Sequence, residues 1–232
     1  MTAFKTVFQD DDCVVVDKPS GLLTMPGRGL AAAEKNLRDL LSSSLAGPVY
    51  VVHRLDRDAS GLILFARNEQ AHRHFSQLFG SDLPQPDPVS GGMPEKKDKE
   101  IKKKYLAAVE GEVLEKRGEI DKPVRAYGSG RMGVGFDGKP SVTRYEVLER
   151  YKRSTLLEVE LVTGRRHQIR VHMYYMKHPV IGDRLYGDQA RQSAYPRLML
   201  HSYSLEFRDM SGRKKTLKAD PPEDFLCVLP FL

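Results

Sequence analysis

His53-Arg54-Leu55-Asp56-Arg57-Asp58-Ala59-Ser60-Gly61 lies between two apolar runs, Tyr50 to Val52 and Leu62 to Ala66. Both runs are typical of short strands, because they are rich in β-branched, aromatic or aliphatic residues. The segment between them places the carboxylate of Asp56 close to two arginines. A nearby cation favours the ionised form of a carboxylate, so Asp56 is a candidate nucleophile or base. The alternative interpretation is an ordinary Asp–Arg pair on the surface.

A second cluster of polar side chains follows a strand near position 161. Three arginines, two histidines and a glutamine fall within residues 163–172, TGRRHQIRVH. We expect a helix that begins after Gly164, with Arg166 and Arg170 on one face and Ile169, Met173 and Met176 on the buried face. Its first turn would offer free N–H groups to an anion. The cluster therefore indicates a phosphate or carboxylate partner, or else a solvated basic face.

The remaining pattern predicts an α+β fold. Strands are expected at residues 13–16, 105–109, 157–161 and 203–207, and helices over 30–41 and after Asn68, a plausible N-cap. Residues 81–104 are rich in proline, glycine and lysine, which predicts a solvated loop or one that touches an RNA backbone. Strands outnumber helices without strict alternation, so a doubly wound fold is not expected.

The composition allows several acidic partners. Lys and Arg number 37 against 31 acidic residues in 232, which gives a net charge of +6. Nucleic acid, an acidic membrane surface and an acidic protein all fit this balance. No apolar run approaches the roughly 18 residues of a membrane span, and the N-terminus lacks the features of a signal peptide. Two cysteines, Cys13 and Cys227, make no disulfide framework, so we expect a cytoplasmic protein.

Two patterns that could indicate a cofactor or metal site lack the surroundings or the spacing that such a site needs. Gly128 to Gly133 fits G-x-G-x-x-G but is followed by a turn-like stretch, which predicts a hairpin loop rather than a dinucleotide site. The histidines lack the spacing of a zinc site: His72 and His74 are two residues apart, and 167, 172 and 178 have no i, i+4 pair. We therefore expect neither a metal nor a nucleotide cofactor.

Taken together, these segments resemble the RluA family of RNA pseudouridine synthases. His53 to Asp56 with Ser60-Gly61 is similar to the motif HRLD-x-x-T-S-G, and residues 164–172 are similar to G-R-x-H-Q-I-R-x-H. Further blocks match in the family's order, across about residues 10 to 210: Asp17 to Gly21 (D-K-P-x-G), Lys104 to Ala107 with Gly111 (K-x-Y-x-A…G), His178 to Asp183 and Leu200 to Ser202.

The resemblance implies isomerisation of a uridine in RNA without cofactor or metal. The N–C glycosidic bond breaks, the base rotates, and a C–C bond forms to the same ribose. Asp56 corresponds to the family's invariant aspartate, and Tyr105 to the tyrosine that stacks on the target base. Arg170 corresponds to the arginine that pairs with the aspartate, with Arg165 as the second candidate. Arg54 resembles the residue that enters the RNA helix where the base has left.

The resemblance also implies a pseudouridine synthase fold, with a mixed, mainly antiparallel sheet in two halves that flank a central basic cleft. We expect one catalytic domain over residues 10–232, after a short segment 1–9, with a loop insertion at 83–103 and no S4-type module. RNA would contact Arg54, Arg57, Arg165, Arg166 and His167. The expected substrates are a tRNA anticodon stem-loop, 23S rRNA or both, bound by a monomer. Ala59 replaces the family threonine and removes a hydroxyl from the turn.

Two rival functions remain open. A catalytically silent RNA-binding protein would not require the carboxylate of Asp56. A glycoside hydrolase usually needs two carboxylates about 5–10 Å apart, and Asp58 would have to supply the second. Because Asp58 lies two positions from Asp56 on the same turn, we favour the isomerase.

Overall fold

The chain folds around one large sheet. The computed structural model describes residues 4–27, 33–80, 101–128 and 130–229. In chain order the elements are β1 (Lys5–Gln9), β2 (Cys13–Lys18), α1 (Leu37–Ser44), β3 (Tyr50–Val51), β4 (Ser60–Ala66), α2 (Glu69–Gly80), β5 (Ile101–Glu110), β6 (Arg117–Asp121), β7 (Val124–Ala126), β8 (Met132–Val134), β9 (Val142–Arg150), β10 (Ser154–Leu161), α3 (Gln168–Tyr175), α4 (Gln189–Gln192), β11 (Leu200–Arg208), β12 (Lys214–Lys218) and α5 (Glu223–Leu226).

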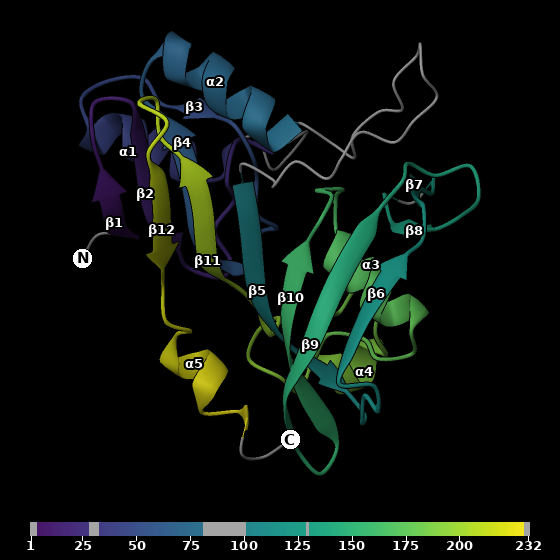
Figure 1. The fold of residues 1–232 in the computed structure, drawn as a ribbon. Coiled ribbons are helices and arrows are strands. Elements are labelled where there is room, and N and C mark those ends of the chain that lie inside the picture. Colours follow the sequence, from purple (N-terminus) through teal and green to yellow (C-terminus); the bar gives the residue numbers. More distant parts are fainter. Residues whose placement is uncertain (1–3, 28–32, 81–100, 129, 230–232) are drawn as a thin grey trace, which may run out of the picture.

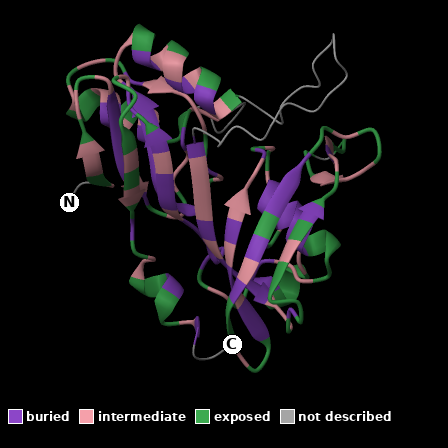
Figure 2. Ribbon diagram, viewed as in Figure 1, coloured by how far each residue is buried: buried purple, intermediate pink, exposed green. Residues whose placement is uncertain are grey.

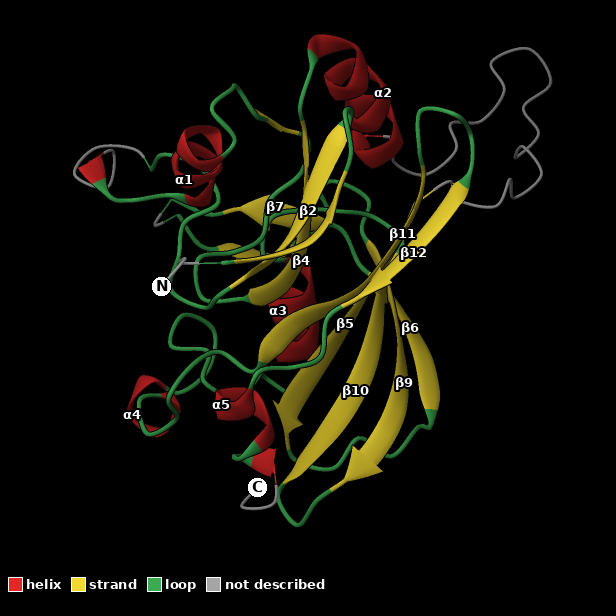
Figure 3. Cartoon of the chain, turned by 90° about the vertical axis from the view of Figure 1, so that its left-hand side faces the viewer, coloured by secondary structure: helices red, strands yellow, loops and turns green. Residues whose placement is uncertain are grey.

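Ten of these strands form the sheet, in the order β1-β2-β4-β11-β5-β10-β9-β6, with β3 on β4 and β12 on β11 (Figure 1). Within the described chain, β4 and β11 pair in parallel and the other pairs of this sheet are antiparallel. The predicted α+β class with a mixed, mainly antiparallel sheet is confirmed. Figure 3 shows the strands running through the middle of the molecule, with the helices outside the sheet.

The parallel pair joins two segments that are distant in sequence. Ser60 faces His201 and Gly61 faces Ser202 across β4 and β11. Gly61 has a φ of +105°, and a Cβ built on it would lie 2.3 Å from the carbonyl oxygen of Ser202. A side chain at position 61 would therefore push the strands apart, which explains the glycine that ends the 53–61 segment.

The core continues from the sheet into the site. Figure 2 shows burial concentrated on the central strands. One buried cluster includes Leu55, Ala59 and Tyr105 together with Ile169 of α3 and Leu200 of β11. The same apolar packing that stabilises the fold thus also fixes the backbone on both sides of Asp56 and directly before Arg170.

The first helix is shorter than the sequence pattern predicts. The expected helix over 30–41 begins only at Leu37; Leu30 lies outside the described residues, and Ala33 precedes the helix. Asn36 caps it, because its side-chain oxygen accepts the backbone N–H of Asp39 at 3.1 Å. The N–H of Leu37 donates to the carbonyl of Leu23 at 2.8 Å, which holds the preceding chain away from helical geometry. The predicted N-cap Asn68 is confirmed, since it accepts the N–H of Ala71 at 2.8 Å.

The lysine-rich segment leads into a central strand. β5 begins at Ile101, so the described part of the expected 83–103 insertion, residues 101–103, is strand; residues 83–100 lie outside the described part. Ile101 is buried and faces Phe207 of β11. The glycine-rich stretch after residue 127 connects β7 to β8 in an antiparallel hairpin, as predicted.

Candidate active site

Asp56 lies on a turn that the N-terminal segment holds in place. The backbone N–H and carbonyl of its neighbour Leu55 both bond to the hydroxyl of Thr24, at 3.3 and 2.9 Å. The Nζ of Lys18, which is fully buried, donates to the carbonyls of Pro19, Leu22 and Arg57 at 2.8–2.9 Å. Burial lowers the pKa of Lys18 to about 7, although the charge of Asp56 opposes the shift. Thr24 therefore anchors the chain before the candidate nucleophile, and Lys18 of the D-K-P-x-G segment anchors the chain after it.

Arg170 of α3 lies between two carboxylates. Its Nη1 donates to Asp56 at 3.0 Å, so the expected ion pair is present. Its Nε and Nη2 donate to the two oxygens of Asp183 at 2.7 and 2.8 Å. Burial opposes the charge of Arg170, but the hydrogen bonds and charges of Asp183 and Asp56 raise its pKa above the ordinary value. This bidentate contact orients the guanidinium so that its remaining edge faces Asp56.

His167 and Tyr186 form a second contact to the same carboxylate. The Nε2 of His167 lies 3.7 Å from Asp56, and its Nδ1 is 2.8 Å from the hydroxyl of Tyr186. Burial lowers the pKa of His167 to about 4, so the ring is neutral at neutral pH. Arg170 also lies over the Tyr186 ring, 5.1 Å from its centroid. The described groups that touch Asp56 thus include one fixed cation and one neutral imidazole.

Tyr105 and Asp56 line the same small cavity of about 60 Å³, together with Arg54, Arg165 and Arg170. Burial and the nearby charge of Asp56 raise the pKa of the Tyr105 hydroxyl, which therefore stays protonated at neutral pH. The structure thus brings together the three residues expected to act in catalysis, although 114 positions separate Asp56 from Arg170.

The other predicted basic residues take different places. Arg54, His167 and Asp56 also line a wider cavity of about 740 Å³, where Arg57 and Arg166 join them. Arg57 points partly away from Asp56, because it forms an ion pair with Glu34 at 2.9 Å. The Nε of Arg165 donates to the carbonyl of Pro140 at 3.3 Å. Arg170, not Arg165, is therefore the partner of Asp56.

The helix of this segment begins later than predicted. α3 starts at Gln168, so Arg166 precedes the helix and shares no helical face with Arg170. The buried amide of Gln168 accepts the N–H of Arg165 at 3.0 Å, which closes a turn instead of a first helical turn. His167 has a φ of +55° at this junction. Met176, expected on the buried face, is exposed after the helix end.

Sequence reasoning missed the carboxylate that holds Arg170. Asp183 is 1% exposed and closes the matched block that begins at His178. An arginine that orients one carboxylate must itself be held by a fixed partner. This requirement could have indicated a second acidic residue beside Arg170. Two further residues near Asp56 also gave no pattern in the sequence: Tyr186, which contacts His167, and Arg184, which lines the 740 Å³ cavity.

Two findings concern the described residues taken together. Within the described ranges, no group of three His, Cys, Asp or Glu side chains is placed to hold a metal ion. No helix of that part of the molecule is long and apolar enough to cross a membrane.

This fold, with an aspartate held by a buried arginine beside a tyrosine, matches one family. Residues 12–175 match the model of the RNA pseudouridylate synthase family. A "Ribosomal large subunit pseudouridine synthase D" from Nitrosomonas europaea is 34% identical over 97% of this chain and 64% of its own length. A "Dual-specificity RNA pseudouridine synthase RluA" from Pasteurella multocida is 35% identical over 87% of this chain and 85% of its own.

The structure of human RNA pseudouridylate synthase domain containing 4 shares the fold, with a TM-score of 0.73 over 97% of this chain and 91% of its own, at 24% identity. The chain belongs to the RNA pseudouridylate synthase family. It spans less than two thirds of the length of the Nitrosomonas relative.

Proposed function

We propose that this protein converts specific uridines in structured RNA into pseudouridine. The observation that carries the proposal is the contact of Arg170 with Asp56 in a cavity that Tyr105 also lines. In the reaction the bond from N1 to C1′ breaks and a bond from C5 to C1′ forms. N1 gains a proton and C5 loses one, so no oxidant or co-reactant is needed.

Each of the three residues has one task in this proposal. Asp56 attacks the sugar or removes a proton, and Arg170 keeps its carboxylate oriented toward the reacting atoms. Tyr105 stacks on the flipped base, and its hydroxyl relays the C5 proton: it accepts that proton as it passes its own to a neighbouring acceptor. Because all three belong to one chain, a single copy is sufficient for the chemistry.

The RNA enters through the wider cavity of 740 Å³ next to Asp56. Leaving the stack costs the target base a few kcal/mol, and Arg54, which is exposed, offsets this by filling the gap in the RNA helix. Arg57, Arg166 and Arg184 line the same cavity and attract phosphates. Positioning residues such as Lys18 do not contact the RNA, because they are buried.

The proposed substrates are a tRNA anticodon stem-loop, large-subunit rRNA or both. The name of the Nitrosomonas relative supports the large ribosomal subunit, and the name of the Pasteurella relative supports more than one RNA. The two cysteines are free thiols, which fits a reducing cytoplasm.

Mapping pseudouridine in total RNA, from cells with and without the protein, tests the proposal and identifies the uridine. Asp56→Asn should abolish the modification while RNA binding is largely kept. The rival function, a catalytically silent RNA-binding protein, predicts identical maps in both cells. Asp11→Asn is the matched control, because this exposed carboxylate lines neither of the cavities that contain Asp56. Turnover by Asp56→Asn at the wild-type rate would refute the mechanism.

A further inference from the structure

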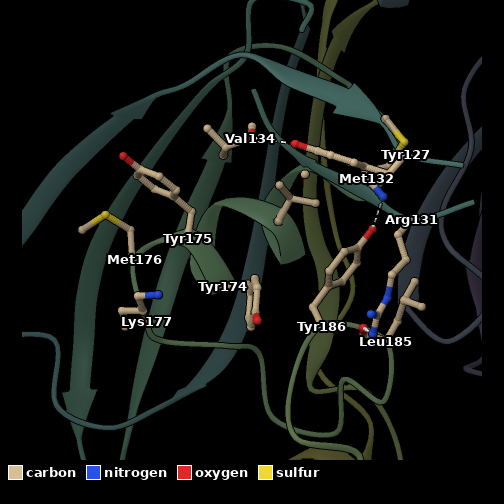
Figure 4. A pocket seen from close by; sticks show the side chains of 12 residues that line it. Tyr127, Arg131, Met132, Val134, Tyr174, Tyr175, Met176, Lys177, Leu185 and Tyr186 are labelled. Atoms are coloured by element: carbon tan, nitrogen blue, oxygen red, sulfur yellow. Dashed lines mark hydrogen bonds between the residues drawn. The ribbon is translucent and has the colours of Figure 1, made fainter. Parts of the chain in front are cut away.

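A second wide cavity lies beside the site, and of the residues around Asp56 described above, Tyr186 lines it. It measures about 840 Å³ and lies between α3 and the β7–β8 hairpin (Figure 4). The hairpin contributes Tyr127 and Arg131, and the end of α3 contributes Tyr174 and Tyr175. One hydrogen bond joins two of its walls: the hydroxyl of Tyr186 accepts the N–H of Met132 at 3.0 Å, which ties the hairpin to the loop after Asp183.

Aromatic rings in this cavity are open to solvent. Tyr127, Tyr174 and Tyr175 are 45%, 51% and 45% exposed, while the core aromatics Phe65 and Phe75 are fully buried. In Figure 4 the Tyr174 ring stands in the space below the hairpin. Exposed tyrosine rings are surfaces on which unpaired bases stack.

The charges around these rings suit a polyanion. Arg131 and Lys177 line the cavity, and the described lining residues include no carboxylate. Lys122 lies above the Tyr175 ring, with its Nζ 6.0 Å from the centroid. Rings interleaved with cations are the arrangement that takes single-stranded nucleic acid, because the rings meet bases and the cations meet phosphates.

The cavity adjoins the catalytic residues, because a series of side-chain contacts joins Tyr174 to Asp56. From Asp56, His167 is 3.7 Å away, the His167 and Tyr186 ring centroids are 5.7 Å apart, and those of Tyr186 and Tyr174 are 6.3 Å apart. Leu185 lines both this cavity and the 740 Å³ cavity that contains Asp56. An RNA strand with one base at Asp56 therefore has its neighbouring nucleotides within reach of Tyr174.

We propose that this cavity is a second base-binding site, which takes an unpaired nucleobase flanking the target uridine of the same RNA. The inference rests on the proposed function for the identity of the RNA strand. The base stacks on Tyr174, and Lys177 and Arg131 contact the adjoining phosphates. The site gives the chain a means of selecting RNA loops with a second unstacked base, since a paired neighbour cannot enter the cavity.

A uridine hexanucleotide with one central 2-aminopurine tests this, because the fluorescence of this base is quenched when it stacks. We expect Tyr174→Ala to weaken binding roughly tenfold and to lose the quenching. Tyr174→Phe keeps the ring and should bind and quench as the wild type does. Lys177→Gln should lower the dependence of log affinity on log salt by about one phosphate contact.

Leu148→Ala is the matched control, because Leu148 is 50% exposed on β9 and lines neither this cavity nor those containing Asp56. Unchanged affinity and quenching in Tyr174→Ala would overturn the inference and leave the cavity to another kind of partner. An equal loss in Leu148→Ala, or a Phe variant as weak as the Ala variant, would overturn it as well. Turnover of the wild-type protein on mapped RNA is measured separately, so a failure of the proposed function is not mistaken for a failure of this site.

Discussion

Replacing Asp183 with asparagine tests the residue that holds Arg170 independently of Asp56, the residue that reacts. One oxygen of Asp183 accepts the Nη2 of Arg170 at 2.8 Å and the backbone N–H groups of Leu185 and Tyr186 at 3.0 and 3.1 Å. The other accepts the Nε of Arg170 at 2.7 Å. In Asp183→Asn the amide oxygen keeps the position with three donors, so its NH₂ group must face the Nε–H of Arg170.

The loss of stability expected for Asp183→Asn follows from the burial of the ion pair between Asp183 and Arg170. Breaking a buried ion pair by removing one partner costs about 3–5 kcal/mol, and the contact to Asp56 that Arg170 retains favours the lower figure. For a chain of this size about 3 kcal/mol corresponds to a fall in Tm of about 6–12 °C. A guanidinium displaced from its place beside Asp56 should also lower kcat by about a hundredfold.

Thermal unfolding followed by circular dichroism, together with turnover on a mapped RNA hairpin, checks both effects. Asp56→Asn is the matched comparison: Arg170 keeps its buried bidentate partner Asp183, so the free energy of unfolding should change less than in Asp183→Asn while turnover is lost. If Asp183→Asn melts within about 1 °C of the wild type, the account of Arg170 as a cation held by Asp183 is wrong.

Three further outcomes follow from the structure. Gly61→Ala should cost about 3 kcal/mol or more in denaturant unfolding because its Cβ meets Ser202, whereas Gly212→Ala, with a φ of +78° but open space, should cost only about 1–2 kcal/mol. His167 stays neutral down to a pKa of about 4 when folded, while the unfolded chain protonates near its ordinary value of 6.5. Stability contributed by His167 is therefore complete above pH 6.5 and lost as the pH falls; His167→Gln should reduce the loss between pH 7 and 5 by about 2 kcal/mol, measured by unfolding at both pH values. Tyr105→Phe keeps the stacking ring, so RNA affinity measured by filter binding should hold while turnover falls about a hundredfold or more; a full rate would exclude a role for the hydroxyl.

Local patterns predicted the elements and several reactive groups. Alternation of apolar residues indicated the strands, and the side chain of Asn68 indicated a helix start, because these signals depend on neighbours within a few residues. The motif around Asp56 and the block ending at His172 identified the carboxylate and its arginine by resemblance. The shortened α1 and the late start of α3 were missed, because the carbonyl of Leu23 and the amide of Gln168 fix those ends through tertiary contacts.

The sequence by itself determined which groups are available: an aspartate between arginines, a tyrosine after lysines, and a basic chain without a long apolar span. Only the tertiary structure decided their use. The parallel contact of β4 with β11 and the packing of α3 bring Asp56 and Arg170 to 3.0 Å. Asp183 is recognised only in the structure, where it is the partner that the buried Arg170 requires. The physical reason is that charge pairing and the covering of aromatic rings depend on neighbours in space. Spacing along the chain does not specify those neighbours.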